Sequence, residues 1–221
     1  MEVNRARRAG APLGDIAAMK FAMIADPPPE LRARLREQSA GCLDLDMDAL
    51  RSMPAGSVGR EYAAHLDRYG LSPLVVSPEL RRRYADDPYG LRYATTHDLF
   101  HVLTGFPTTP AGEVGLFAFM IGQGFAKRRL LWLSALVYTL LLPLHLPGVW
   151  RNRRVGLAMA KSARNLLTEP IEALLELPLA EARRRLGLPL DPRDAGIAPG
   201  HRSLLYEWLI PKPSSTPAAT T

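Results

Sequence analysis

The fold of this chain is decided by residues 89–113, YGLRYATTHDLFHVLTGFPTTPAGE. The stretch predicts two consecutive helices. The first begins at about Tyr89 and ends at Gly105, because glycine is the residue most common just after a helix C-terminus. The second begins at Pro110, since Thr109 is a favourable N-cap and proline is well tolerated in a first helical turn. Glu113 then falls in or just after the first turn of the second helix.

The same stretch contains a candidate metal site. His97 and His101 are four residues apart and share one helix face, so both imidazoles can reach one ion. Asp98 lies about 100° round the helix from His97 and can bind the same ion or orient an imidazole. Tyr93 lies on the histidine stripe as a hydrogen-bond donor, and Glu113 would complete the site from the second helix. Such a set suits Zn²⁺, Fe²⁺ or Mn²⁺. The alternative is two ordinary helical histidines with local salt bridges. Three other histidines have no such company and are expected to be structural: His65, His145 and His201.

The rest of the sequence predicts an all-α fold, because apolar residues recur at helical spacing and sustained alternation is absent. Val75-Val76 is a candidate strand without an evident partner. A helix expected over residues 110–128 contains four glycines, which indicates close approach to another helix or to a ligand. Further helices are expected over residues 15–24 with Asp15 as N-cap, 30–38, 48–53, 57–70, 156–167 and 179–186.

The chain is expected to form one domain over residues 15–210. Residues 1–14 are basic and include Gly10 and Pro12, which predicts a loose arm. Residues 211–221, PKPSSTPAATT, are of low complexity and are predicted to be disordered. No internal repeat and no interdomain linker is evident.

The composition restricts the partners and the compartment. The net charge is +6, and the arginines come in clusters that suit an anionic membrane, nucleic acid or simply a solvated helix face. Nucleic acid is disfavoured because the clusters contain almost no aromatic residues. Cys42 is the single cysteine and no secretory signal follows the N-terminus, so a cytoplasmic protein in a reducing compartment is expected.

An apolar run covers residues 130–150, LLWLSALVYTLLLPLHLPGVW, and contains no Asp, Glu, Lys or Arg. Its length is enough to span a bilayer, but Pro143 and Pro147 interrupt a continuous helix. The run is therefore interpreted as a core or dimer helix, an interfacial membrane contact or, least favoured, a transmembrane segment.

His97-Asp98-x-x-His101, followed by Glu113, resembles the signature of the coenzyme Q biosynthesis protein 4 family. Residues 53–62 (MPAGSVGREY) and 177–187 (LPLAEARRRLG) are similar to two further blocks of that family. The resemblance covers roughly residues 45–190. It implies a mostly helical, lipid-binding, peripheral membrane protein of ubiquinone biosynthesis. It also implies that His97, Asp98, His101 and Glu113 bind a metal, zinc being the most expected.

The leading hypothesis is a metal-dependent decarboxylase, a lyase that replaces the carboxyl group of a polyprenylated hydroxybenzoate by hydroxyl. Glu113 and Asp98 are the candidate catalytic residues, and Arg60, Arg92 and Tyr93 are the candidate substrate contacts. The expected partners are the prenylated quinone precursor, the inner-membrane lipid surface and other ubiquinone biosynthesis enzymes. Residues 110–128 and 130–150 offer surfaces for a homodimer.

Two rival hypotheses remain open from the sequence. One is a non-catalytic lipid-binding scaffold that organises the other enzymes and whose metal is structural. The other is a metal-dependent phosphohydrolase, which would need further histidine and aspartate ligands downstream. Phosphate loops, dinucleotide-binding glycine patterns, CxxC pairs and nucleophile elbows are absent from the sequence.

Overall fold

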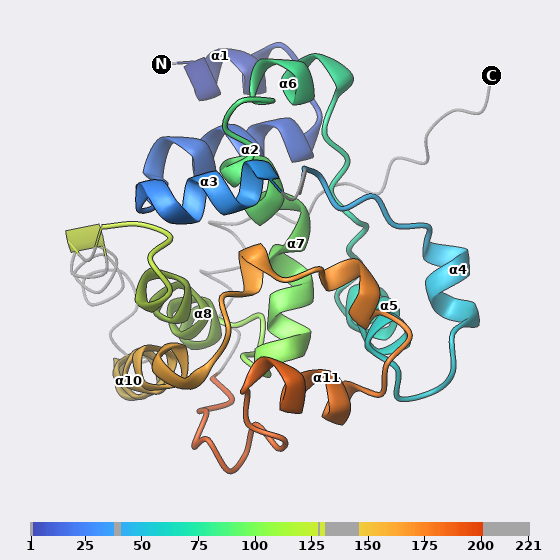
Figure 1. Ribbon diagram of the computed structural model, residues 1–221, viewed down its shortest axis with the longest axis vertical. Coiled ribbons are helices and arrows are strands. Elements are labelled where there is room, and N and C mark those ends of the chain that lie inside the picture. The colour runs from blue at the N-terminus through green and yellow to red at the C-terminus, as the bar shows by residue number, and fades with distance from the viewer. Residues whose placement is uncertain (1, 38–40, 128, 131–145, 201–221) are drawn as a thin grey trace.

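The computed structural model describes residues 2–37, 41–127, 129–130 and 146–200. The predicted all-α class is confirmed, because these residues form packed helices and no strand (Figure 1). The elements, in chain order, are α1 (Glu2–Arg8), α2 (Leu13–Ile24), α3 (Pro29–Glu37), α4 (Met47–Ser52), α5 (Val58–Tyr69), α6 (Pro78–Arg83), α7 (Tyr89–Thr104), α8 (Pro110–Gly122), α10 (Leu146–Ser162), the short 3-10 helices η2 (Leu166–Thr168) and η3 (Ile171–Leu174), and α11 (Leu179–Leu186).

Helix α7 is the centre of the fold. Fourteen of its sixteen residues are buried, as expected for a helix that is packed on every side. In Figure 1 it runs between α5 on one side and α8 on the other, with α2 at its N-terminal end and α11 at its C-terminal end. The central helix is therefore the one that carries both histidines of the candidate metal site.

Helices α8 and α10 cross in close contact, as the glycine content of residues 110–128 predicted. A Cβ atom added at Gly156 would lie 2.2 Å from the carbonyl oxygen of Gly115, and one added at Gly122 would lie 2.5 Å from the Cβ of Ala160. The helix that begins at Pro110 ends at Gly122 rather than near residue 128. It stops there because Gly124 turns the chain with a positive φ of 85°.

Helix α5 is fixed at its N-terminus by the segment that precedes α11. The Ser57 side chain caps the helix by accepting from the Arg60 N–H, as predicted, and Gly70 closes it in the left-handed conformation. The amides of Val58 and Gly59 donate to the carbonyls of residues 177 and 175. This anchorage sets α5 against α7.

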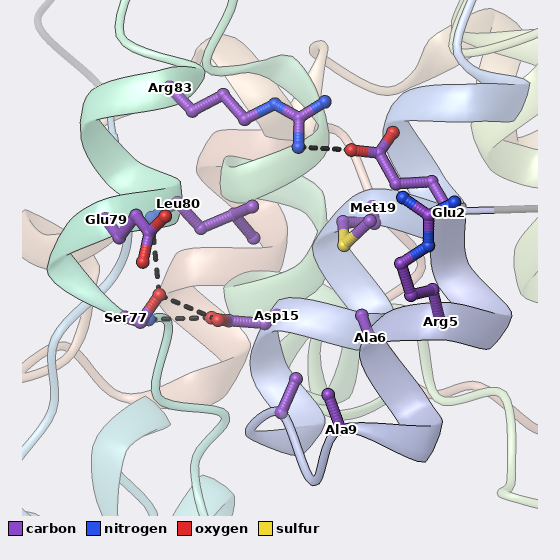
Figure 2. A pocket seen from close by; sticks show the side chains of 11 residues that line it. Glu2, Arg5, Ala6, Ala9, Asp15, Met19, Ser77, Glu79, Leu80 and Arg83 are labelled. Carbon is purple, nitrogen blue, oxygen red and sulfur yellow. Dashed lines mark hydrogen bonds and ion pairs between the residues drawn. The ribbon is translucent and has the colours of Figure 1, made fainter.

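Residues 2–8, within the segment expected to be a loose arm, form α1. Val3 and Ala6 pack against the small apolar cluster shared by α2, α6 and α7. Figure 2 shows the charged side of this junction, where the Arg83 guanidinium of α6 donates to the Glu2 carboxylate at 2.5 Å. This basic segment therefore folds because one face of α1 is apolar and because its first helical residue, Glu2, forms an ion pair with Arg83.

The prediction that Asp15 is the N-cap of α2 is wrong, because that helix begins at Leu13. Its carboxylate instead accepts the Ser77 N–H and the Ser77 hydroxyl, both at 2.7 Å, and so joins α2 to the start of α6 (Figure 2). Val75 and Val76 are extended but pair with no strand in the described part of the chain.

The helix predicted over residues 156–167 begins earlier, at Leu146, and ends at Ser162. Pro147 lies in its first turn, where the missing N–H costs little. Most of the apolar run 130–150 and the predicted tail 211–221 lie outside the described residues. Among the helices of the described residues, none has the length and apolarity that a bilayer crossing requires.

Candidate metal centre

The candidate centre is built at the junction of α7 and α8. Gly105 ends α7 with a φ of 80°, and five residues later Pro110 begins α8. The Thr109 hydroxyl accepts from the Gly112 N–H at 3.3 Å, which is the predicted N-cap. A Cβ at Gly112 would lie 1.7 Å from the Pro107 carbonyl oxygen, so this turn requires glycine. The tight connection brings the first turn of α8 beside the histidine face of α7.

Three side chains converge there as predicted. The Nε2 atom of His97 lies 3.5 Å from one carboxylate oxygen of Glu113, and the Nε2 atom of His101 lies 3.3 Å from the other. One donor atom from each of the three residues fits within a 4.8 Å span. Among the described residues, these three are the histidine, cysteine or carboxylate side chains that lie close enough together to bind one metal ion.

The other nitrogen of each imidazole is already engaged. The Nδ1 atom of His97 lies 3.1 Å from an Asp98 carboxylate oxygen, and the Nδ1 atom of His101 lies 2.8 Å from the Phe106 carbonyl oxygen. Metal-binding histidines usually donate the second ring N–H to a carboxylate or a carbonyl in this way. The Nε2 atom of His101 is buried without a hydrogen-bond partner within the described structure. The donor set therefore fits a divalent ion.

Asp98 lies beside this group rather than within it. Its carboxylate holds the His97 ring, so the structure favours the orienting role over direct ligation, two roles that the sequence left open. The His101 side chain is fully buried, whereas those of His97 and Glu113 are 20% and 25% exposed. His97 and Glu113 therefore lie at the solvent-facing side of the group and His101 at its buried side.

The charges in the group stabilise one another. Burial disfavours the charged form of His97, but hydrogen bonds to Asp98 and Glu113 outweigh it and raise the pKa of His97 to about 10. Burial alone would raise the pKa of Glu113, yet the two histidines hold that pKa well below its usual range. A metal that takes the Nε2 atom of His97 must therefore displace a proton.

Tyr93 contributes to an aromatic wall beside His97. Its ring lies edge-on to His97 at a centroid distance of 5.5 Å and contacts Phe125 at 4.2 Å. Phe21 from α2 belongs to the same wall, with its ring 4.5 Å from that of Tyr93 and stacked 5.9 Å from that of His97. The sequence placed Tyr93 near the histidines correctly but gave no sign of Phe21, which is 76 residues away in the chain.

Arg92 and Arg60 lie apart from the three converging side chains. The Arg92 side chain is 1% exposed and forms a bidentate ion pair with Glu172, at 2.5 and 3.0 Å. That pairing ties α7 to η3 and occupies the guanidinium. Arg60 is exposed on α5. Within the described residues, neither arginine forms a hydrogen bond or ion pair with His97, His101 or Glu113, so neither position supports the predicted carboxylate contact.

His65 of α5 belongs to the surroundings of the site, although its sequence context indicated an ordinary structural histidine. Its ring lies nearly parallel to that of His101, at 15° and 6.0 Å between centroids. Burial, together with the neighbouring His101, lowers the pKa of His65 to about 4. Spacing within the sequence could not reveal this contact, because α5 and α7 are separated by two loops and α6.

An apolar groove lies between α1 and α2 and ends at the aromatic wall. Its volume is about 650 Å³, and Ile16, Phe21 and Ile24 line it together with the more exposed Leu13 and Met23. Phe21 belongs both to the groove and to the wall that contacts His97. The groove and the candidate centre are thus joined through one side chain.

Comparison with known proteins places these features in a family. Residues 9–192 match the family described as coenzyme Q (ubiquinone) biosynthesis protein Coq4. Among curated proteins, the mitochondrial ubiquinone biosynthesis protein coq4 of Aspergillus fumigatus is 35% identical over 193 residues, which is 80% of this chain and 62% of that protein. The corresponding protein of Yarrowia lipolytica is 41% identical over 109 residues, 47% of this chain and 40% of its own length.

Two further comparisons agree. The mitochondrial COQ4 protein of Pyricularia oryzae is 33% identical over 194 residues, covering 81% of this chain and 60% of that protein. The chain therefore spans less than two thirds of these curated relatives. A crystal structure of a putative ubiquinone biosynthesis protein from Nostoc punctiforme shares the fold, with a TM-score of 0.57 and 22% identity over 80% of this chain and 82% of that one.

Proposed function

Because the chain belongs to the coenzyme Q (ubiquinone) biosynthesis protein Coq4 family, we propose that it is a metal-dependent enzyme of that pathway. The proposed reaction replaces the carboxyl group of a polyprenylated hydroxybenzoate by hydroxyl: the carboxyl group leaves as carbon dioxide, and dioxygen, with one water molecule, accepts two electrons and leaves as hydrogen peroxide. The observation that supports this proposal most is the convergence of the Nε2 atoms of His97 and His101 on the carboxylate of Glu113.

The residues would hold the metal as follows. His97, His101 and Glu113 supply one donor atom each, while Asp98 and the Phe106 carbonyl keep the two imidazoles in position. When bound, a divalent ion supplies positive charge that stabilises carboxylate or phenolate oxygens. Zinc is the first expectation from the resemblance, and Fe²⁺ and Mn²⁺ suit the same donors.

The substrate would lie with its ring at the centre and its tail in the groove between α1 and α2. Phe21 supports this placement, because its ring faces His97 and also lines the groove. Binding of a hydrocarbon tail to this apolar lining is favoured by roughly 25 cal/mol for each Å² of apolar surface removed from water. The buried Tyr93 ring of the aromatic wall would exclude water from the substrate ring, whereas Arg92 would act on the fold through Glu172.

The substrate would come from a bilayer, so we expect peripheral contact with the inner membrane. Leu13 and Met23 at the rim of the groove are 49% and 71% exposed, and Lys20 lies among them. Apolar side chains beside a cation suit the interface of an anionic bilayer. Co-sedimentation with vesicles should fall when Met23 and Leu13 are both replaced by serine, and unchanged binding would contradict this contact.

Turnover is the test of the enzymatic proposal. Purified protein loaded with zinc, iron or manganese is given a short-chain prenylated hydroxybenzoate with and without dioxygen, and carbon dioxide is measured. We expect the wild-type protein to release carbon dioxide in the presence of dioxygen. The Glu113→Gln variant should fold as wild type does but release no carbon dioxide. Absence of carboxyl loss with every metal would contradict the proposal.

The rival scaffold is favoured by a different observation. The three donors come from two helices, so an ion would cross-link α7 to α8 and could serve the fold alone. In that case metal removal lowers the melting temperature and weakens binding of partner enzymes together, and the metal-loaded protein shows no turnover.

A further inference from the structure

His65 is the third imidazole near the candidate centre. It projects from α5, which packs against α7, and its ring faces that of His101 at 6.0 Å. Tyr69, one turn further along α5, contacts the same ring edge-on at 4.8 Å. The orientation of His65 is therefore set by an aromatic neighbour on its own helix and by the metal-site helix opposite.

The Nε2 atom of His65 is buried and has no hydrogen-bond partner within the described part of the chain. A buried polar atom without a partner destabilises the fold, because it has lost its hydrogen bonds to water. Phenylalanine would fill the same space against Tyr69 and His101 without that cost. A buried imidazole nitrogen is expected to have a hydrogen-bonding role when the residues around it offer no partner.

The nitrogens of the other two imidazoles are already assigned. The Nδ1 atoms of His97 and His101 have acceptors, and their Nε2 atoms face Glu113. The Nε2 atom of His65 is thus a further ring nitrogen beside the centre, and within the described residues it has no hydrogen-bond partner that would keep it from a ligand. A neutral imidazole can donate to, or accept from, a ligand oxygen.

We propose that His65 binds the substrate, by a hydrogen bond from its imidazole to a carboxylate or phenolate oxygen of the aromatic acid at the centre. This inference rests on the proposed function, because it needs an oxygen-bearing ligand beside His97, His101 and Glu113. It adds a binding residue from α5 to a site otherwise built from α7 and α8.

The test uses the full chain loaded with Co²⁺ and the probe 3,4-dihydroxybenzoate, whose binding is followed by the visible spectrum of the ion. His65→Phe keeps the ring and its packing but removes both nitrogens. We expect it to bind Co²⁺ as wild type does and to bind the probe about tenfold to a hundredfold more weakly. His65→Gln, which restores a polar group, should recover part of the affinity. The control is Ala64→Gln on the exposed face of α5, expected to match wild type.

Stability provides the readout that separates a binding role from a structural one. Removal of an unpartnered buried nitrogen should leave the melting temperature of His65→Phe unchanged or higher. Equal probe affinity in wild type and His65→Phe would overturn the inference. Loss of Co²⁺ or of stability in His65→Phe would also overturn it, since His65 would then serve the ion or the fold. Wild type that binds Co²⁺ but not the probe contradicts the inference alone, whereas failure to bind Co²⁺ contradicts the proposed function as well.

Discussion

Replacing Gly156 by alanine tests the helix contact that holds α8, and with it Glu113, in place. The new Cβ would lie 2.2 Å from the Gly115 carbonyl oxygen and 2.9 Å from the Phe119 nitrogen. Both are backbone atoms, so α8 and α10 must separate by about 1 Å to restore ordinary contact. Overpacking of this kind costs about 1–3 kcal/mol or more, and the better helix propensity of alanine returns about 1 kcal/mol.

Because the clash is with backbone atoms, the cost lies at the upper end of that range, about 3 kcal/mol, and the net loss is about 2 kcal/mol, which is roughly 4–8 °C in melting temperature for a chain of this length. The assay is urea unfolding followed by far-UV circular dichroism. Metal affinity should fall in the same variant, because Glu113 lies two residues before Gly115. Gly41→Ala is the control, since a Cβ there meets no atom within 4 Å. A Gly156→Ala protein as stable as wild type would refute the tight-crossing argument.

Three further predictions concern the supports of the site. Thr109→Ala removes the cap of α8 and should cost about 1 kcal/mol in urea unfolding, whereas Thr109→Ser should not; an equal cost for both would contradict the capping role. Glu172→Gln removes the charge partner of the buried Arg92 and should cost about 2 kcal/mol; a neutral effect on the melting temperature would show that the pair is unimportant. Because the pKa of His97 is raised from 6.5 to about 10, its ion pair stabilises the metal-free protein fully below about pH 6.5 and is lost as the pH rises through about 10. Divalent-metal affinity, measured by calorimetry, should rise with pH over the same interval as that proton becomes easier to displace, and a pH-independent affinity would contradict this.

The sequence predicted those parts of the site that depend on residues close together in the chain. Thr109, Pro110 and Gly105 act through their own backbone and immediate neighbours, so they located the junction of α7 and α8 correctly. The spacing of His97 and His101 fixed their common face for the same reason. The glycines of α8 also predicted a close helix neighbour, although not which helix.

Contacts between distant segments could not be predicted in this way. Arg92 was expected at the substrate, because nothing near it in the sequence reveals its bidentate partner, the half-exposed Glu172, which lies 80 residues further on. The position of Asp15 predicted an N-cap, yet its carboxylate accepts hydrogen bonds from Ser77 and so joins α2 to the start of α6. His65 was assigned a structural role for lack of nearby companions, and only the packing of α5 on α7 brings it to His101.

The central claim is that His97, His101 and Glu113 together hold one divalent ion. The most direct measurement is the metal content per chain of purified protein, compared with His97→Ala, His101→Ala and Glu113→Ala. The account predicts about one ion per wild-type chain, little in each of the three variants, and full occupancy in His65→Phe. Equal metal content in wild type and the three alanine variants would contradict it.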